Sequence, residues 1–226
     1  MMNGELVKTI TSDGLELAGF WMDQKSDIAV LHTHGTAGDF YTHKFIEVEG
    51  EQLASQNISF LTANNRGHDV IADIRKLEGD QIGWKQVGGA YENIEESVFD
   101  IDAWVQFLVS RGVKKIILQG HSLGPNKTIY YQYKNQNPYV VGFIHISPQN
   151  DAGLMRDKFG QKKYERVNQM IHEKLKQGKG REILPEEFFE VCPISVQGYS
   201  GYFIEDAIGN LFPYHNPKKS KLGCAP

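Results

Sequence analysis

The chain has 226 residues and a formal charge of -4 at pH 7, which suits one sizeable domain and argues against a nucleic-acid partner, since such partners normally need a basic surface. Its first nine residues include the charged Glu5 and Lys8 and no long apolar run, so we expect no secretory signal or membrane anchor there. No stretch approaches the ~20 apolar residues that span a bilayer. Two cysteines, Cys192 and Cys224, do not make a disulfide framework or a metal site, so we expect a reduced, cytoplasmic protein.

The first half of the chain predicts a β-hairpin followed by alternating strands and helices. Turn residues at 11–14 join two segments of alternating apolar residues, which favours an antiparallel hairpin. Short apolar runs further on are typical of strands buried on both faces of a parallel sheet. In chain order these elements are strands at 5–10, 15–21 and 28–31, a helix at 44–56 and a strand at 58–63. The polar stretch 64–89 carries no predicted element.

The middle of the chain continues this alternation. Residues 94–111 form the clearest helical pattern, with apolar residues at three- and four-residue steps and Gly112 where a helix stop is favoured. A strand at 115–119, a helix at 128–135 and a strand at 140–146 follow. Alternating strands and helices predict an α/β fold, a mostly parallel sheet with helices on both faces.

After residue 148 the alternation stops. The charged segment 161–177 predicts an amphipathic helix, and shorter helical pieces are predicted at 186–191 and 202–211. We therefore expect an α/β core at 1–148, a helical cap or lid at 149–213 and an irregular tail at 214–226.

The strongest chemical signal is the segment Gly120-His121-Ser122-Leu123-Gly124, which joins a predicted strand to a predicted helix. Small residues on both sides of Ser122 permit a tight turn, and the following helix directs its free N–H groups toward that turn. Pro125 falls in the first helical turn, where a missing N–H costs little. This context predicts a nucleophile elbow with Ser122 as the nucleophile. An incidental serine in a glycine-rich turn is the alternative.

A second motif, His32-Thr33-His34-Gly35-Thr36, follows the predicted strand at 28–31. Acyl chemistry at Ser122 creates a negatively charged oxygen, and each preplaced hydrogen-bond donor to it is worth ~3 kcal/mol of barrier. We predict that the backbone N–H groups of Leu123 and Thr36 are these donors. A plain glycine loop is the alternative interpretation.

These motifs, together with Arg66-Gly67-His68 and Ser147-Pro148, make the segment from Leu15 to Ser147 resemble the α/β-hydrolase family. The resemblance is closest to small lipase-, esterase- and acyl-peptidase-like members. It implies hydrolysis of an ester, a thioester or a small amide through an acyl-Ser122 intermediate, with a small-molecule acyl substrate and no metal or organic cofactor. It also implies a scaffolding role for Arg66 and His68, with substrate contact as the alternative.

The acid and the histidine that activate the serine in this family come later in the chain. Three residues after Ser122 are candidates for these roles. Asp151 suits a turn or helix start, with a triad acid as the alternative, and His172 suits the solvated surface of a charged helix. His215 lies in the irregular tail, with folding back to the site as the alternative. Since none matches a family position, we expect an incomplete hydrolase that ends before the last two strands. The strand at 140–146 would then be an edge that favours aggregation or dimerisation. A catalytically silent binding module and an acyltransferase that uses the same serine remain alternatives.

Overall fold

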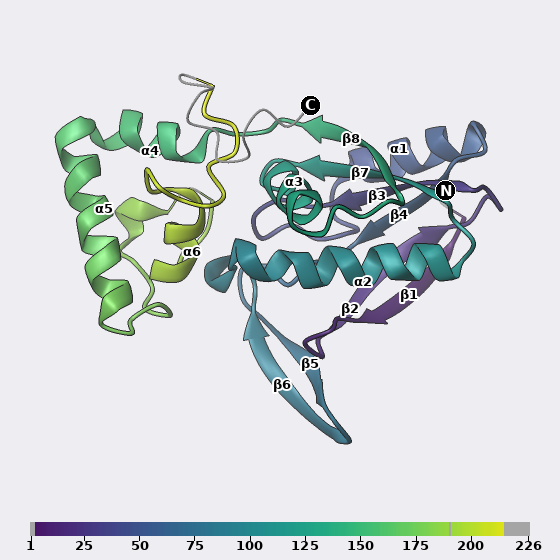
Figure 1. Ribbon diagram of the computed structural model, residues 1–226, viewed down its shortest axis with the longest axis horizontal. Helices are drawn as coiled ribbons and strands as arrows, with labels where there is room; N and C mark the ends of the chain where they lie inside the picture. The colour runs from purple at the N-terminus through teal and green to yellow at the C-terminus, as the bar shows by residue number, and fades with distance from the viewer. Residues whose placement is uncertain (1–2, 190, 215–226) are drawn as a thin grey trace.

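The computed structural model describes residues 3–189 and 191–214, and its centre is a six-stranded sheet (Figure 1). The strand order is β1-β2-β4-β3-β7-β8. The strands are β1 (Glu5–Ile10), β2 (Glu16–Met22), β3 (Ile28–Thr33), β4 (Ser59–Ala63), β7 (Lys115–His121) and β8 (Val140–Ile146). Strands β1 and β2 form the predicted antiparallel hairpin, β2 pairs antiparallel with β4, and β3, β4, β7 and β8 run parallel.

Helices cover both faces of the sheet (Figure 1). They are α1 (Lys44–Ser55), α2 (Ser97–Ser110) and α3 (Gly124–Asn135). Successive residues of a strand point to opposite faces. In β3, Val30 packs with Ile46 of α1, whereas Ala29 and Leu31 belong to the core cluster that contains Trp104 of α2. This layered arrangement confirms the predicted fold class.

A second antiparallel hairpin, β5 (Ala72–Glu78) and β6 (Gln81–Val87), occupies the polar stretch in which no element was predicted. Its turn contains Gly79 at φ 62°, a conformation that glycine adopts without strain. Only Ile74 and Val87 are buried in the hairpin, while Ile82 and Trp84 are exposed. Because few side chains of the hairpin are buried and several are charged, its sequence lacks the regular apolar alternation of a half-buried strand. The sequence pattern therefore did not reveal these strands.

The segment after β8 is helical and has its own apolar cluster. Its elements are α4 (Asp151–Phe159), α5 (Gln161–Lys176), η3 (Glu186–Phe188) and α6 (Val196–Tyr202). Leu123 and Tyr130 of the core belong to the same cluster, so this segment packs on the start of α3. Of the predicted tail, only Tyr214 lies within the described residues.

Two helical predictions in this segment were wrong. The described residues of 186–191 contain only the single turn η3, and the helix predicted at 202–211 lies earlier, as α6. The start of α6 is fixed by Ser195, whose hydroxyl accepts the Gly198 N–H at 3.1 Å. At the other end, the Gly209 N–H donates to Gly201 O at 2.8 Å, which folds the chain back over α6 instead of extending it. Helix α4 was not predicted.

Strand β8 is the last strand in the sheet order and carries exposed apolar side chains. Val141 is 56% exposed, Phe143 40% and Ile144 38%. The exposed apolar edge that the sequence predicts is therefore present in the described part of the chain. Within those same residues, no helix is both long enough and apolar enough to cross a membrane.

Candidate functional site

The turn between β7 and α3 holds Ser122 in a backbone conformation that is rare for a residue with a side chain. Its φ is 57°, and its N–H donates to Ile146 O at 3.0 Å. A Cβ atom at Gly120 would lie 2.2 Å from the Pro125 nitrogen, and one at Gly124 would lie 2.2 Å from Thr33 O. Both glycines are therefore required by close backbone contacts, and the turn has the tightness that the sequence predicts.

The loop from β3 to α1 packs directly against this turn. A Cβ atom at Gly35 would lie 2.7 Å from the Ser122 Cβ and 3.0 Å from the Leu123 nitrogen. Thr36 and Leu123 line one cavity of about 10 Å³, room for about a single water molecule, and Tyr202 and Phe203 also line it. The structure thus brings Ser122, Thr36 and Leu123 together beneath the helical segment.

His34 has both ring nitrogens committed to the backbone of this loop. Its Nε2 accepts the Asn65 N–H at 3.1 Å, so the proton resides on Nδ1, which donates to Gly35 O at 2.9 Å. Complete burial, reinforced by the neighbouring Lys127 charge, holds the pKa of His34 well below its usual value. The neutral ring is a structural part of the loop and has no nitrogen free to act as a base.

A buried ion pair lies beside the same loop. Lys127 of α3 places its Nζ 2.5 Å from Glu92 Oε1 and 3.2 Å from Asn65 Oδ1, and both charged side chains are almost fully buried. Burial raises the pKa of Glu92. Sequence reasoning missed this pair because Lys127 and Glu92 lie far apart in the sequence. The available signal was a lysine in the first turn of an otherwise buried helix.

Arg66 anchors the loop after β4, in keeping with the scaffolding role expected for it. Its guanidinium is 2% exposed and forms ion pairs with Asp13 at 2.9 Å, Glu96 at 2.8 Å and Asp100 at 2.8 Å. Its neighbour His68 is mostly buried, places its Nδ1 2.7 Å from Asp69 Oδ2, and donates its backbone N–H to Asn65 O at 3.0 Å. These contacts hold the loop in place.

The later acid and histidine candidates that the structure describes lie on different helices. Asp151 is buried at the start of α4, whereas His172 lies partly exposed on α5, where Nε2 is 3.2 Å from Asp206 Oδ2. His215 lies outside the described residues. Within the described part of the chain, the Ser122 hydroxyl makes no hydrogen bond, and no group of three or more His, Cys, Asp or Glu side chains is arranged to hold a metal ion.

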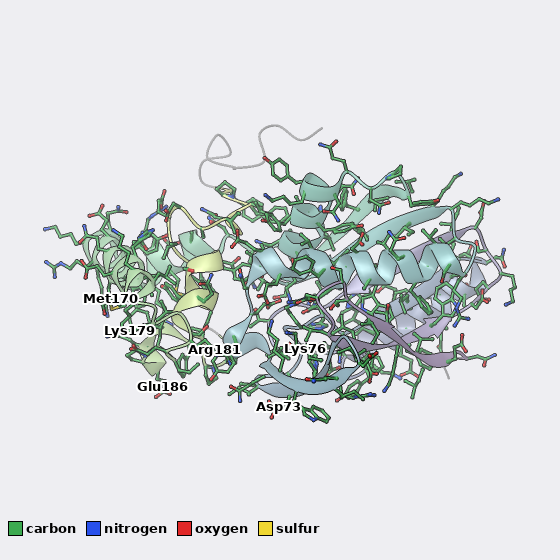
Figure 2. All side chains as sticks on the ribbon, turned by 60° about the horizontal axis from the view of Figure 1, so that its bottom comes forward. Asp73, Lys76, Met170, Lys179, Arg181 and Glu186 are labelled. Carbon is green, nitrogen blue, oxygen red and sulfur yellow. The ribbon has the colours of Figure 1, made fainter. Side chains whose placement is uncertain are left out.

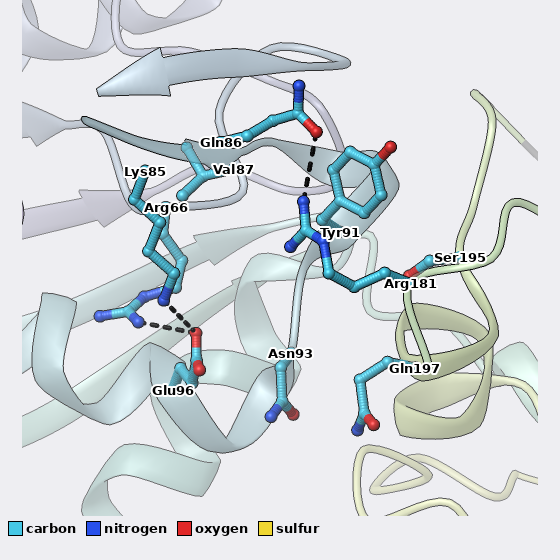
Figure 3. Close-up of a pocket in the computed structure, with 10 residues that line it drawn as sticks. All are labelled: Arg66, Lys85, Gln86, Val87, Tyr91, Asn93, Glu96, Arg181, Ser195 and Gln197. Carbon is cyan, nitrogen blue, oxygen red and sulfur yellow. Dashed lines mark hydrogen bonds and ion pairs between the residues drawn. The ribbon is translucent and has the colours of Figure 1, made fainter. Parts of the chain in front are cut away.

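A larger polar cavity of about 270 Å³ lies between β6, the chain around Tyr91 and the helical segment (Figure 3). Arg181 reaches across it from the helical segment, with its guanidinium 4.1 Å from the centre of the Tyr91 ring. It also donates to Gln86 Oε1 at 3.2 Å. Figure 2 shows Arg181 between the hairpin that carries Asp73 and Lys76 and the helical segment. These contacts connect the hairpin to the helical segment.

The sheet, its flanking helices and the β7–α3 turn define an α/β-hydrolase fold. A family model described as a protein of unknown function, DUF1749, matches residues 82–202, which is more than half of the chain. The chain therefore belongs to the DUF1749 family.

Solved structures with this fold include the esterase Pf2001 of Pyrococcus furiosus, with 22% identity over 73% of this chain and 59% of that one and a TM-score of 0.53. DcsB in complex with its substrate analogue shows 18% identity over 94% and 65%, with a TM-score of 0.58. An α/β-hydrolase-fold protein of unknown function shows 12% identity over 88% and 62%, with a TM-score of 0.62. The chain thus spans about three fifths of their lengths, and such identities show the fold alone. A search of curated proteins finds no match.

Proposed function

We propose that this protein is a serine hydrolase that cleaves an ester, a thioester or a small amide through an acyl-Ser122 intermediate. The observation that carries the proposal is the β7–α3 turn. Ser122 sits there at positive φ between two glycines that tolerate no side chain, at the N-terminal end of a helix. A strained turn of this kind presents a serine hydroxyl to a substrate rather than burying it in the sheet.

In the proposed reaction, the Ser122 Oγ attacks the carbonyl carbon of the substrate. The alcohol, thiol or amine leaves with the proton of the serine hydroxyl, and water then releases the acid from Ser122. During both steps the carbonyl oxygen carries negative charge, and the backbone N–H groups of Thr36 and Leu123 stabilise that charge by donating hydrogen bonds to it. The N-terminal end of α3 favours the same charge. No cofactor takes part.

The helical segment at 149–213 serves as the cap of this site. Tyr202 and Phe203 line the cavity with Thr36 and Leu123, and that cavity holds little more than one water molecule. An acetyl group is larger than one water molecule, so an acyl group that enters beside Leu123 requires Tyr202 or Phe203 to move. Longer acyl groups require a larger movement, so we propose a preference for short-chain esters.

A catalytically silent binding module is the second candidate, and the Ser122 hydroxyl favours it, because within the described residues that hydroxyl has no hydrogen-bonded base. Acyl transfer to an acceptor other than water would use the same residues. A fluorophosphonate probe distinguishes an active hydrolase from a binding module without catalytic activity, since covalent labelling requires an activated serine.

The test compares the wild-type chain with Ser122→Ala and with Ser110→Ala, which removes an exposed hydroxyl far along α2. We expect labelling and hydrolysis of p-nitrophenyl acetate in the wild type and in Ser110→Ala, and neither in Ser122→Ala. Undiminished turnover in Ser122→Ala would remove the proposal. A wild type that is folded but never labelled would favour the binding module.

A further inference from the structure

Lys127 places a buried positive charge beneath the loop that carries Thr36. Besides Glu92 and Asn65, its Nζ faces two backbone carbonyls of that loop, His34 O at 3.4 Å and Gly35 O at 3.5 Å. An ammonium group is costly to bury unless charges and dipoles surround it. Glu92 supplies the opposite charge, and the carbonyl dipoles of the loop complete the environment.

The peptide between Gly35 and Thr36 connects this charge to the proposed oxyanion donor. A peptide bond is planar and trans, so its C=O and N–H point in opposite directions. The Gly35 oxygen receives the His34 Nδ1–H at 2.9 Å and faces the Lys127 ammonium. The N–H of Thr36 therefore points away from Lys127. Because Gly35 has no side chain, this peptide would otherwise rotate easily.

We propose that Lys127 is a positioning residue that holds the Gly35–Thr36 peptide in the orientation that offers the Thr36 N–H to the acyl oxygen. The inference rests on the proposed function. Lysine suits this place because one ammonium has three donors, which can serve several acceptors, and a flexible stem that reaches them from α3. Glu92 keeps the ammonium in place through the ion pair at 2.5 Å.

The experiment replaces the pair rather than the lysine alone, because Lys127→Met by itself would leave Glu92 buried without a cation. The double variant Lys127→Met/Glu92→Gln keeps the volume and removes both charges. Tyr131→Phe is the matched control. Tyr131 lies one turn further along α3, and its buried hydroxyl donates to Asp102 Oδ1 at 2.9 Å, away from the loop.

Two readouts report on the oxyanion donor: the rate of Ser122 labelling by a fluorophosphonate, and the kcat and KM for p-nitrophenyl acetate. We expect the double variant, folded by circular dichroism, to lose about 100-fold in labelling rate and in kcat, with KM nearly unchanged, as for loss of one oxyanion donor. Tyr131→Phe should label like the wild type.

The outcomes separate this inference from the proposed function. A double variant that labels as fast as the wild type, while Ser122→Ala does not label, overturns the role of Lys127 and leaves the hydrolase proposal intact. A wild type without Ser122-dependent labelling overturns both. If the double variant does not fold, Glu92→Gln alone decides, because it removes the ion pair that keeps the ammonium beside the loop. A slower labelling rate with KM nearly unchanged, while Tyr131→Phe labels like the wild type, supports the role of Lys127, and labelling at the wild-type rate overturns it.

Discussion

Replacing Gly124 by alanine tests the close contact between α3 and β3 on which the site depends. A Cβ atom there would lie 2.2 Å from Thr33 O, whereas real Cβ contacts are essentially never shorter than 3.0 Å. Since the obstructing atom is backbone, the start of α3 and the end of β3 must separate by most of an ångström. Overpacking of this kind costs ~1–3 kcal/mol. For a chain of this size that lowers Tm by roughly 2–12 °C.

The same displacement changes the chemistry. Gly124 follows Leu123, and Thr33 lies three residues before Thr36, so separating α3 from β3 moves the two proposed donors apart. A misplacement of about 1 Å can cost ~100-fold in rate. We therefore expect Gly124→Ala to slow Ser122 labelling by about 100-fold at a temperature where the variant is fully folded.

Gly142→Ala supplies the matched control, because an added Cβ in that part of β8 meets nothing within 4 Å. Gly142 is not at positive φ, so alanine there should be neutral or stabilise by up to ~1 kcal/mol. Urea unfolding gives the free energy of unfolding, and the fluorophosphonate rate gives the chemistry. A Gly124→Ala variant with the stability and labelling rate of the wild type would refute the steric reasoning.

Three further predictions follow from single residues. Thr36→Ala should change the rate of acylation little, because it keeps the backbone N–H. Thr36→Pro deletes that N–H and should slow acylation about 100-fold or more. Equal rates for the two variants in a single-turnover assay would indicate a side-chain role instead. Burial lowers the pKa of His32 to about 3 against ~6.5 in the unfolded chain, so its contribution to stability is complete above pH 6.5 and is lost on acidification at about 1.4 kcal/mol per pH unit. The urea midpoint of the His32→Gln variant should therefore fall less than that of the wild type between pH 6.5 and 5. Equal falls in the two proteins would contradict this. Antiparallel pairing of the exposed β8 edge with a second copy should give a concentration-dependent dimer in light scattering that Val141→Lys abolishes. A wild type that stays monomeric at all concentrations would exclude that interface.

The elements that the sequence predicted best are those whose signals are local. Strands β1 and β8 have the predicted bounds, because alternation or an apolar run alone defines them. The turn at Ser122 was also predictable, since glycines, a strand before it and Pro125 after it are all adjacent in the sequence. Local chemistry decides such features before any tertiary contact forms.

The missed features depend on contacts between distant segments. The β5–β6 hairpin is largely exposed, so its pattern lacks the apolar contrast of a buried strand. Lys127 and Glu92 are far apart in the sequence, and neither has a neighbour that predicts the other. Their pairing becomes favourable only when α3 packs against the chain around Glu92 and excludes water. Only the folded structure could therefore reveal that these two charges pair.

Asn65 joins the two buried charge networks beneath the site. Its N–H donates to His34 Nε2 and its Oδ1 lies near Lys127, while the next residue, Arg66, is fixed to Asp100 of α2 through its backbone N–H at 2.8 Å and its guanidinium. Buried ion pairs contribute little net stability, but their geometry is specific. The loop that carries Thr36 is thereby tied through Asn65 to α2 and through Lys127 to α3. The spacing of the two proposed donors, Thr36 and Leu123, therefore depends on these side chains as well as on the close contact between α3 and β3.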